Sequence, residues 1–234
     1  VDTAKGRVAD GVGGVMEIHL PDSWQEKKLG EVVAQFVGGG TPSKDVHEYY
    51  SGDIPFMTVK DMKVFRPNDT IDHITPEAIA DSSSKLVPSD TLIIATRMGL
   101  GKVVRPTVPV AINQDLKAVF PTPCIDKSFL EYWFNSKSHY LEASGTGTTV
   151  KGLRLEFLRN LVIPIAPLNE QKRIVDKIEQ LFSNLDEGES LLRKVQQQLN
   201  IYRQSVLKAA VTGELTTAVP DIPLRPVFRG YEGI

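Results

Sequence analysis

The chain has 234 residues, 41% of them hydrophobic, and its 27 basic and 29 acidic side chains leave a formal charge of -2. These values allow one large domain or a smaller one with an appendage, and they exclude the extreme compositional classes and any overall attraction to nucleic acid or anionic membrane. The single cysteine, Cys124, excludes an internal disulfide, and no apolar run approaches the roughly 20 residues of a membrane helix, so we expect a soluble, cytoplasmic protein without a membrane partner.

Residues 1–19 mix charged side chains with glycines and lack the apolar segment of a signal peptide, which predicts a flexible leader. From residue 20 to 166, short apolar runs alternate with turn residues, as is typical of a strand-rich domain with a few helices. Strands are expected at Glu31–Val37 and Asp53–Val59, and the continuous apolar run within Thr91–Thr96 predicts a strand buried on both faces. Asp126–Tyr140 has the apolar spacing of a helix, with Asp126 placed as its cap.

Residues 167–212 predict a single long helix, because Gly188 is the only glycine or proline between Asn169 and Thr212. Its apolar side chains recur at intervals of four and three, the heptad pattern of a coiled-coil seam. The expected helix-pairing residues are Ile174, Ile178, Leu181, Leu185, Leu192, Val195, Leu199, Tyr202 and Val206. The expected class is therefore α+β, a strand-rich mixed domain followed by a long coiled-coil α-helix. Residues 213–234 contain three prolines and predict an irregular tail.

Charge is divided along the expected helix. Between Glu170 and Glu189 there are three basic and six acidic residues, whereas between Ser190 and Thr212 there are four basic residues and none acidic. The helix dipole alone explains such a gradient. The gradient also means that two such helices pair better antiparallel, since the acidic half of one then meets the basic half of the other. We therefore predict an antiparallel homodimer.

The sequence carries no motif for catalysis or metal binding. Its four histidines lack ligand spacing, no nucleophile motif occurs, and the glycine-containing stretch Arg97–Lys102 lacks the spacing of a phosphate-binding loop. We therefore expect no catalytic residue, no bound metal and no enzyme activity. Basic charge gathers locally instead: Lys85–Lys117 has five basic and two acidic residues, and Thr146–Arg159 has three basic and one acidic.

These basic stretches include small and hydroxyl-rich loops, a combination that suits duplex DNA. Lysine and arginine hold phosphates, and Arg, Asn, Gln or Lys read base edges. An ordinary solvated surface has the same composition, and charge alone favours that interpretation. The candidate DNA-binding residues are Thr41, Ser43, Lys44, Lys60, Lys63, Arg66, Arg97, Met98, Lys102, Asn113, Gln114, Thr146, Thr148, Thr149, Lys151 and Arg154.

Longer motifs spread over residues 20–215 carry a resemblance to a known family. Two of them, Ile163–Gln171 and Tyr202–Leu215, are quite specific to it. The others are Trp24–Val37 with Gly39–Ser43, Tyr49–Phe56 with Val59–Asp61, Ala95–Gly99 with Gly101–Lys102, Ala111–Leu116 and Gly147–Leu153. On these motifs the chain resembles one half of a DNA specificity (S) subunit of type I restriction-modification systems.

The resemblance implies a target recognition domain over residues 20–166 and a conserved-region helix over residues 167–212. A complete S subunit has two such units, whose antiparallel helices set the gap between two DNA half-sites and form the platform for two modification (M) subunits. The implied partners are double-stranded DNA, the M subunits and, through the complex, the restriction subunit. S-adenosylmethionine and ATP with Mg belong to those partners, so no cofactor is expected on this chain.

This sequence holds one such unit rather than two. It is therefore either a natural half-subunit, which a homodimer would complete, or a fragment of a longer chain. In a homodimer the target would be an inverted repeat with a nonspecific spacer. The alternative from another functional class is a coiled-coil adaptor whose globular head binds a protein instead of DNA.

Overall fold

The structure is a computed structural model that describes residues 20–147 and 151–215. The chain divides into two compact units with the boundary between Lys177 and Ile178, and each unit is described by itself. The first unit mixes strands with short helices, and the second contains most of a long helix. The expected α+β class with a long C-terminal helix is confirmed.

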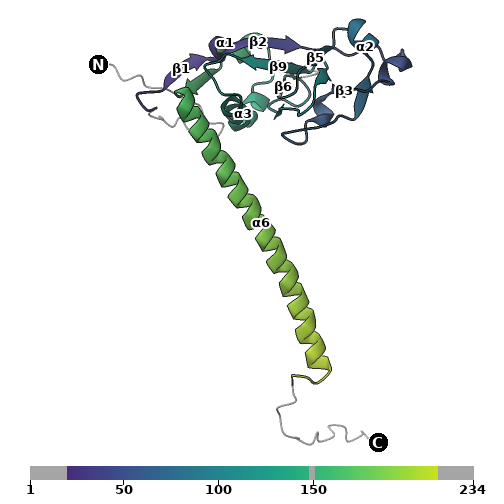
Figure 1. Ribbon diagram of the computed structural model, residues 1–234, viewed down its shortest axis with the longest axis vertical. Coiled ribbons are helices and arrows are strands. Elements are labelled where there is room, and N and C mark those ends of the chain that lie inside the picture. The colour runs from purple at the N-terminus through teal and green to yellow at the C-terminus, as the bar shows by residue number, and fades with distance from the viewer. Residues whose placement is uncertain (1–19, 148–150, 216–234) are drawn as a thin grey trace, which may run out of the picture. The chain divides into compact units, whose positions relative to one another are not determined.

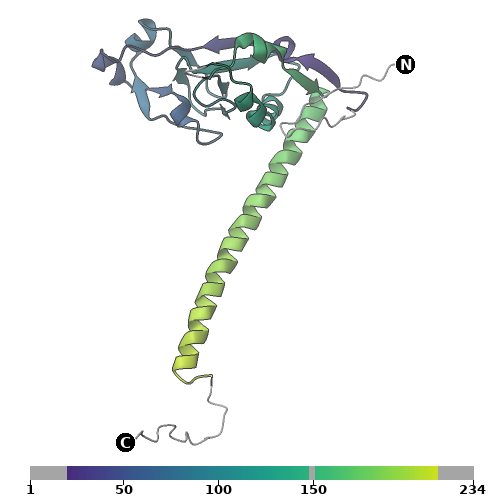
Figure 2. The same cartoon turned by 180° about the vertical axis from the view of Figure 1, so that it is seen from behind.

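The described strands of the first unit form three sheets (Figures 1 and 2). One antiparallel sheet has the order β2 (Val33–Gly38), β9 (Leu116–Pro121), β6 (Leu92–Ala95) and β7 (Val103–Val104). A mixed sheet has the order β4 (Asp72–Ile74), β3 (Ile54–Met57), β8 (Val110–Ile112) and β5 (Lys85–Val87), with β3 and β8 parallel. A two-stranded sheet pairs β1 (Gln25–Lys28) with β10 (Val162–Ile165).

Short helices connect and cover these sheets. The described α-helices are α1 (Leu29–Val32), α2 (Pro76–Ala80), α3 (Lys127–Ser136), α4 (Ser138–Ala143), α5 (Leu155–Asn160) and α6 (Leu168–Val211). Two 3-10 helices, η1 (His47–Tyr50) and η2 (Val59–Asp61), lie on either side of β3 in the sequence. Figure 1 shows α3 against the sheet that contains β6 and β9.

Strand β6 is buried on both faces, as its sequence predicts. Leu92 and Ile94 belong to the apolar cluster that includes α3, while Ile93 and Ala95 belong to the cluster between the two four-stranded sheets. All four side chains are fully buried. A strand packed on two sides needs apolar residues at every position, so apolar and polar residues do not alternate along β6.

Two of the expected elements have different boundaries. Of Glu31–Val37, the first residues close helix α1 and only the part from Val33 is strand. Strand β3 ends at Met57 rather than Val59, because the Asp61 carboxylate accepts hydrogen bonds from the Thr58 backbone N–H (2.8 Å) and hydroxyl (2.9 Å) and turns the chain into η2. This reciprocal capping satisfies the backbone of a short helix.

Asp126 caps helix α3 as predicted, because its Oδ1 accepts from the backbone N–H of Ser128 (2.9 Å) and Phe129 (3.0 Å). It ends at Ser136, and α4 then continues past Tyr140, so the expected single helix is two. Phe129, Leu130, Trp133 and Phe134 are buried, in line with the predicted apolar face.

The first turns of α6 are fixed to the first unit by Gln171, which is fully buried. Its Oε1 accepts from the Asp126 N–H (2.8 Å), and its Nε2 donates to the carbonyls of Cys124 (3.1 Å) and Ala166 (2.8 Å). Val175 is buried and Ile174 is partly buried in the same apolar core. Ile174, which was predicted as a helix-pairing residue, therefore contributes to the core of the first unit.

Candidate nucleic-acid interface

The connection between β6 and β7, Arg97–Lys102, is a tight turn with an unusual backbone. Met98 has φ 57° and Gly101 has φ 82°. A side chain at Gly101 would also clash with the Ser138 backbone, so only glycine is accommodated there. Met98 occupies the left-handed region without being glycine, and strained residues of this kind gather at functional sites. Arg97, Met98 and Lys102 are all exposed.

The turn between β8 and β9, Asn113–Asp115, locks this connection in place. The Asp115 carbonyl accepts from the backbone N–H of Thr96 (2.8 Å) and Arg97 (3.2 Å), and its carboxylate lies 3.6 Å from Arg97 Nε. Asn113 is buried, with its Oδ1 accepting from the Asp115 N–H (3.1 Å) and its Nδ2 donating to the Asp115 carboxylate (3.1 Å). The polar atoms of Asn113 are therefore used to hold the turn.

The loop after β2 is joined to the same turn. The Gly40 N–H donates to the Ile112 carbonyl (3.2 Å), and the Thr41 hydroxyl donates to Oε1 of the exposed Gln114. With Oε1 engaged, the Gln114 amide N–H groups remain as donors toward solvent. Ser43 and Lys44 are exposed on the same loop.

A fourth segment comes from beyond α4. Thr146 and Gly152 exchange backbone hydrogen bonds of 3.0 and 2.8 Å, Gly152 forms a bridge with Arg97, and the Leu153 N–H donates to the Thr96 carbonyl (2.9 Å). Lys151 is exposed, as is Arg154, which precedes α5. The predicted Thr148 and Thr149 lie outside the described residues.

These hydrogen bonds bring together residues that are far apart in the sequence. We use the name loop surface for the segments Thr41–Lys44, Arg97–Lys102, Asn113–Asp115, Thr146–Gly147 and Lys151–Gly152. The 3-10 helix η2 adjoins it, because Val59 Cγ1 lies 2.5 Å from the position that a Cβ on Gly99 would take. Lys60 and Lys63 are exposed on and after η2.

The lysines of this region have no acidic partner among the described residues. No ion pair there involves Lys44, Lys60, Lys63, Lys102 or Lys151. Carboxylates of the same region are occupied instead: Asp115 faces Arg97, and Asp61 caps η2. The near-zero charge of the chain thus conceals a surface with free positive charge, which is the requirement for holding phosphates.

Arg66 is placed differently from the other candidates. Its guanidinium makes a two-fold hydrogen bond with the carboxylate of Glu131, which is 1% exposed, with Nη2 to Oε2 at 2.8 Å. Arg105 Nε lies 3.4 Å from the same carboxylate and 3.2 Å from Asp90. Burial lowers the pKa of Arg66, but the hydrogen bond and the charge of Glu131 raise it by more. Arg66 therefore serves to fix the chain after η2 onto α3.

Sequence reasoning missed Asp115 and Glu131, which organise the loops. Asp115 stands beside two predicted residues in the motif Ala111–Leu116, and that adjacency was a signal for its role. Glu131 lies 65 positions from Arg66, and only its position among the apolar residues of a helix hints at burial.

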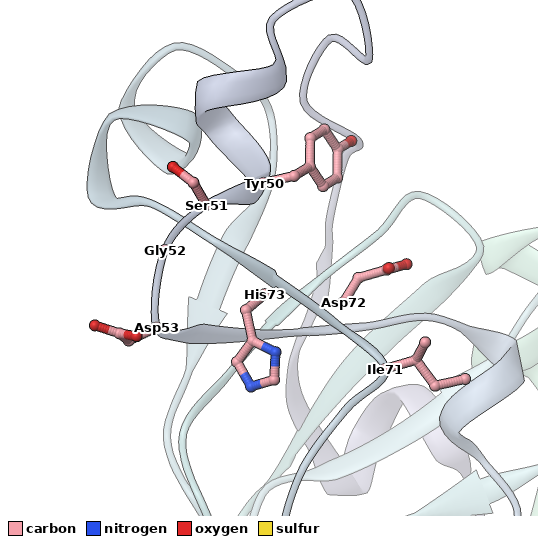
Figure 3. A pocket seen from close by; sticks show the side chains of 7 residues that line it. All are labelled: Tyr50, Ser51, Gly52, Asp53, Ile71, Asp72 and His73. Carbon is pink, nitrogen blue, oxygen red and sulfur yellow. The ribbon is translucent and has the colours of Figure 1, made fainter.

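A separate pocket of about 520 Å³ lies around the β3–β4 hairpin (Figure 3). Its lining residues are Tyr50, Ser51, Gly52, Asp53, Ile71, Asp72 and His73. In Figure 3 the carboxylates of Asp53 and Asp72 point to different sides. Burial and the charge of Asp72 raise the pKa of Tyr50. A pocket with this acidic lining repels phosphate, and it forms no part of the loop surface.

Other kinds of site are not found within residues 20–147 and 151–215. No group of three or more His, Cys, Asp or Glu side chains there is arranged to hold a metal ion. In that same part of the chain, no helix is both long and apolar enough to cross a membrane.

Known proteins with similar sequences share one function in their names. The specificity subunit of the type I restriction enzyme EcoR124I/EcoR124II from Escherichia coli is 35% identical over 190 residues, which cover 76% of this chain and 46% of that protein. The specificity subunit of the enzyme MjaIX from Methanocaldococcus jannaschii is 28% identical over 184 residues, 75% of this chain and 42% of that protein. The chain thus spans about half the length of these curated relatives.

Solved structures share the fold at lower identity. The crystal structure of the HsdS subunit from Thermoanaerobacter tengcongensis matches with a TM-score of 0.62 and 22% identity, over 82% of this chain and 45% of that one. A chain from a structural study of assembly and conformational transition in the type I R-M system matches with a TM-score of 0.64 and 23% identity, over 86% and 47%.

The family described as "Type I restriction modification DNA specificity domain" matches residues 21–197, which take in the whole loop surface and the long helix as far as Gln197. This agrees with the expected role in specificity rather than catalysis. The chain combines a strand-rich unit, whose fixed loops carry lysine and arginine side chains, with a long helix that has an apolar seam. It belongs to the type I restriction-modification DNA specificity family.

Proposed function

We propose that this chain reads a specific sequence in duplex DNA through the loop surface, as the recognition part of a type I restriction-modification system. The observation that carries the proposal is the convergence of distant segments. Arg97, Gln114 and Thr41 are joined through one turn, and the lysines around them have no carboxylate partner among the described residues. Fixed exposed donors with free positive charge are what base edges and phosphates require.

The salt dependence of DNA binding tests this proposal. Log K should fall linearly with log salt, and replacing Lys102 or Lys151 with Gln should reduce the slope by about 0.9 for each phosphate that is no longer neutralised. Lys28→Gln, a matched exposed lysine on β1, should leave the slope unchanged. If the chain showed no salt-dependent affinity for any duplex while its head captured a protein, the adaptor alternative would hold.

The second unit supports the proposed homodimer. The large apolar side chains at its predicted seam positions from Leu181 to Val206 are between 37% and 71% exposed. Such exposure is typical of a helix face that another helix covers in the assembled protein. The point midway between Leu181 and Val206 in the sequence is also midway between Leu192 and Val195, so both pairs are symmetric about the same point of the helix. An antiparallel pair centred on that midpoint therefore sets the seam of one helix against the seam of the other and the acidic halves against the basic halves.

Cross-linking distinguishes the two orientations. In a Cys124→Ser background, the double variant Leu181→Cys with Val206→Cys should form a disulfide-linked dimer, because antiparallel packing opposes these positions. The single variant Leu181→Cys is the control and should stay monomeric on a denaturing gel. A cross-link from the single variant would demonstrate parallel helices and contradict the proposed assembly.

We further propose that the paired unit docks the adenine-methylating M subunits and reads an inverted repeat. The support is that relatives about twice as long are named specificity subunits, so two copies of this chain have roughly the length of one relative. Adenine methylation mapped in a genome where the chain is co-expressed with its M subunit should mark an inverted repeat with a nonspecific spacer. Methylation of an asymmetric site would contradict the homodimer.

A further inference from the structure

Three large apolar side chains are exposed on the two loops that adjoin the free lysines. Val64 is 59% exposed, Phe65 55% and Met98 67%. We call these three residues the apolar tips. Contact of these apolar side chains with water raises the free energy of the unbound chain. Their exposure therefore points to a bound state in which they are covered.

The two loops lie side by side. A groove of about 240 Å³ is lined on one side by Met62–Phe65 and on the other by Gly101–Val104. Val59 also touches the position that a Cβ on Gly99 would take, next to Met98. The apolar tips thus belong to one region, which is continuous with the loop surface.

The backbone under these tips is held rigidly. The Phe65 carbonyl accepts from the Arg105 N–H (2.9 Å), and the Pro67 carbonyl accepts from the Thr107 N–H (2.9 Å). Between them Arg66 is bound to the buried Glu131. The side chains of Val64 and Phe65 therefore remain outside because their backbone is fixed, and they cannot fold back into the core without breaking this network.

Charge indicates what covers the tips. Lys60, Lys63 and Lys102 lie on the same two loops, and none has an acidic partner among the described residues. An apolar protein surface placed there would bury these charges unpaired, which is strongly unfavourable. Duplex DNA offers phosphates to the lysines and stacked bases to the apolar side chains.

We propose that the apolar tips act as a wedge against a base step of the bound DNA, with the neighbouring lysines on the flanking phosphates. This inference rests on the proposed function and adds DNA deformation to it. Phe and Met are among the side chains that unstack a base step and bend the duplex, and sequences that deform easily are then preferred. The tips would thus contribute to specificity without a hydrogen bond to any base.

The test begins with duplexes selected by the wild-type chain from a library with a randomised centre. The selected site is then labelled with 2-aminopurine, whose fluorescence rises when its neighbours unstack. Phe65→Ala should weaken binding by roughly 5- to 100-fold, as for the removal of one base–aromatic stack, and should remove the fluorescence rise. The salt slope should remain that of the wild type, because no cation is removed.

Two further variants separate binding from folding. Met98→Gly places the residue best suited to φ 57° at that position, so its stability should equal or exceed that of the wild type while affinity and fluorescence fall. Leu86→Ala removes an apolar side chain that is 50% exposed on β5 and should change neither. Wild-type affinity and fluorescence in both Phe65→Ala and Met98→Gly would overturn the wedge. Failure of the wild type to select any duplex would instead overturn the proposed function.

Discussion

Replacement of Gln171 with leucine should separate the first turns of α6 from the first unit. The side chain is fully buried and makes three hydrogen bonds of 2.8, 3.1 and 2.8 Å to backbone groups of Asp126, Cys124 and Ala166. Leucine has similar volume but leaves one N–H and two carbonyls without a partner. Each buried group left unsatisfied costs about 1–3 kcal/mol, and the added apolar contact offsets part of it, so we expect a loss of about 3–5 kcal/mol.

Urea denaturation of the full chain, followed by circular dichroism and tryptophan fluorescence, measures this loss. Gln197→Leu is the control, because Gln197 is exposed on the same helix away from the seam and should change the free energy of unfolding by less than about 0.5 kcal/mol. Gln171→Glu adds a second readout. The introduced carboxylate cannot donate to either carbonyl when it is ionised, and it can donate to one of them when it is protonated. The stability deficit of this variant relative to the wild type should therefore narrow, without vanishing, as the pH falls. A Gln171→Leu variant within about 1 kcal/mol of the wild type would refute the structural role of these hydrogen bonds.

Two more predictions concern the ion pairs around α3. Among the described residues, Arg66→Met leaves the more distant Arg105 as the one cation near Glu131, and it should lower the free energy of unfolding by about 2–4 kcal/mol. The double variant with Glu131→Gln should be less destabilised than the single one, which a double-mutant cycle in urea measures. Burial raises the pKa of Asp90, but the hydrogen bond from Lys127 and the charges of Arg105 and Lys127 lower it by more. The ionised form is thus favoured by folding, and its stabilisation is present above the ordinary Asp pKa of about 3.9 and is lost as the pH falls through the lower folded value. Asp90→Asn, which keeps a residue that tolerates φ 58°, should make stability less dependent on pH in this acidic range; an unchanged pH profile would contradict the assignment.

Local sequence patterns predicted the helices and strands that depend on interactions between residues close in the sequence. The apolar run of β6, the Asp126 cap of α3 and the long helix α6 each follow from neighbours within a few positions, and each is found in the structure. The early end of β3 was missed because the Thr58–Asp61 capping pair competes with strand propensity. That competition depends on the hydrogen bonds of this one residue pair, and hydrophobic periodicity does not reveal it.

The candidate site was predictable as a set of residues but not as an arrangement. Composition identified Arg97, Gln114 and Lys151, yet their proximity depends on backbone hydrogen bonds between segments separated by tens of residues. The same limit explains Arg66 and Asn113. Both have the chemistry of base readers, but their partners Glu131 and Asp115 occupy their polar atoms. Tertiary contacts decide which donors are free to bind DNA, and a count of charges along the sequence does not reveal these contacts.

The fixed loops also bear on how recognition is divided among side chains. Backbone hydrogen bonds hold Arg97 and the turn at Gln114 in the free chain, so DNA binding need not order this part of the backbone. The affinity difference between right and wrong bases must then come from side chains that end in solvent, such as Gln114 and Lys60, and from the deformation imposed by the apolar tips. Changes at these exposed positions should alter the preferred DNA sequence while the free energy of unfolding stays within about 0.5 kcal/mol of the wild type. Changes at Asp115 or Glu131 should lower stability and affinity for all sequences together.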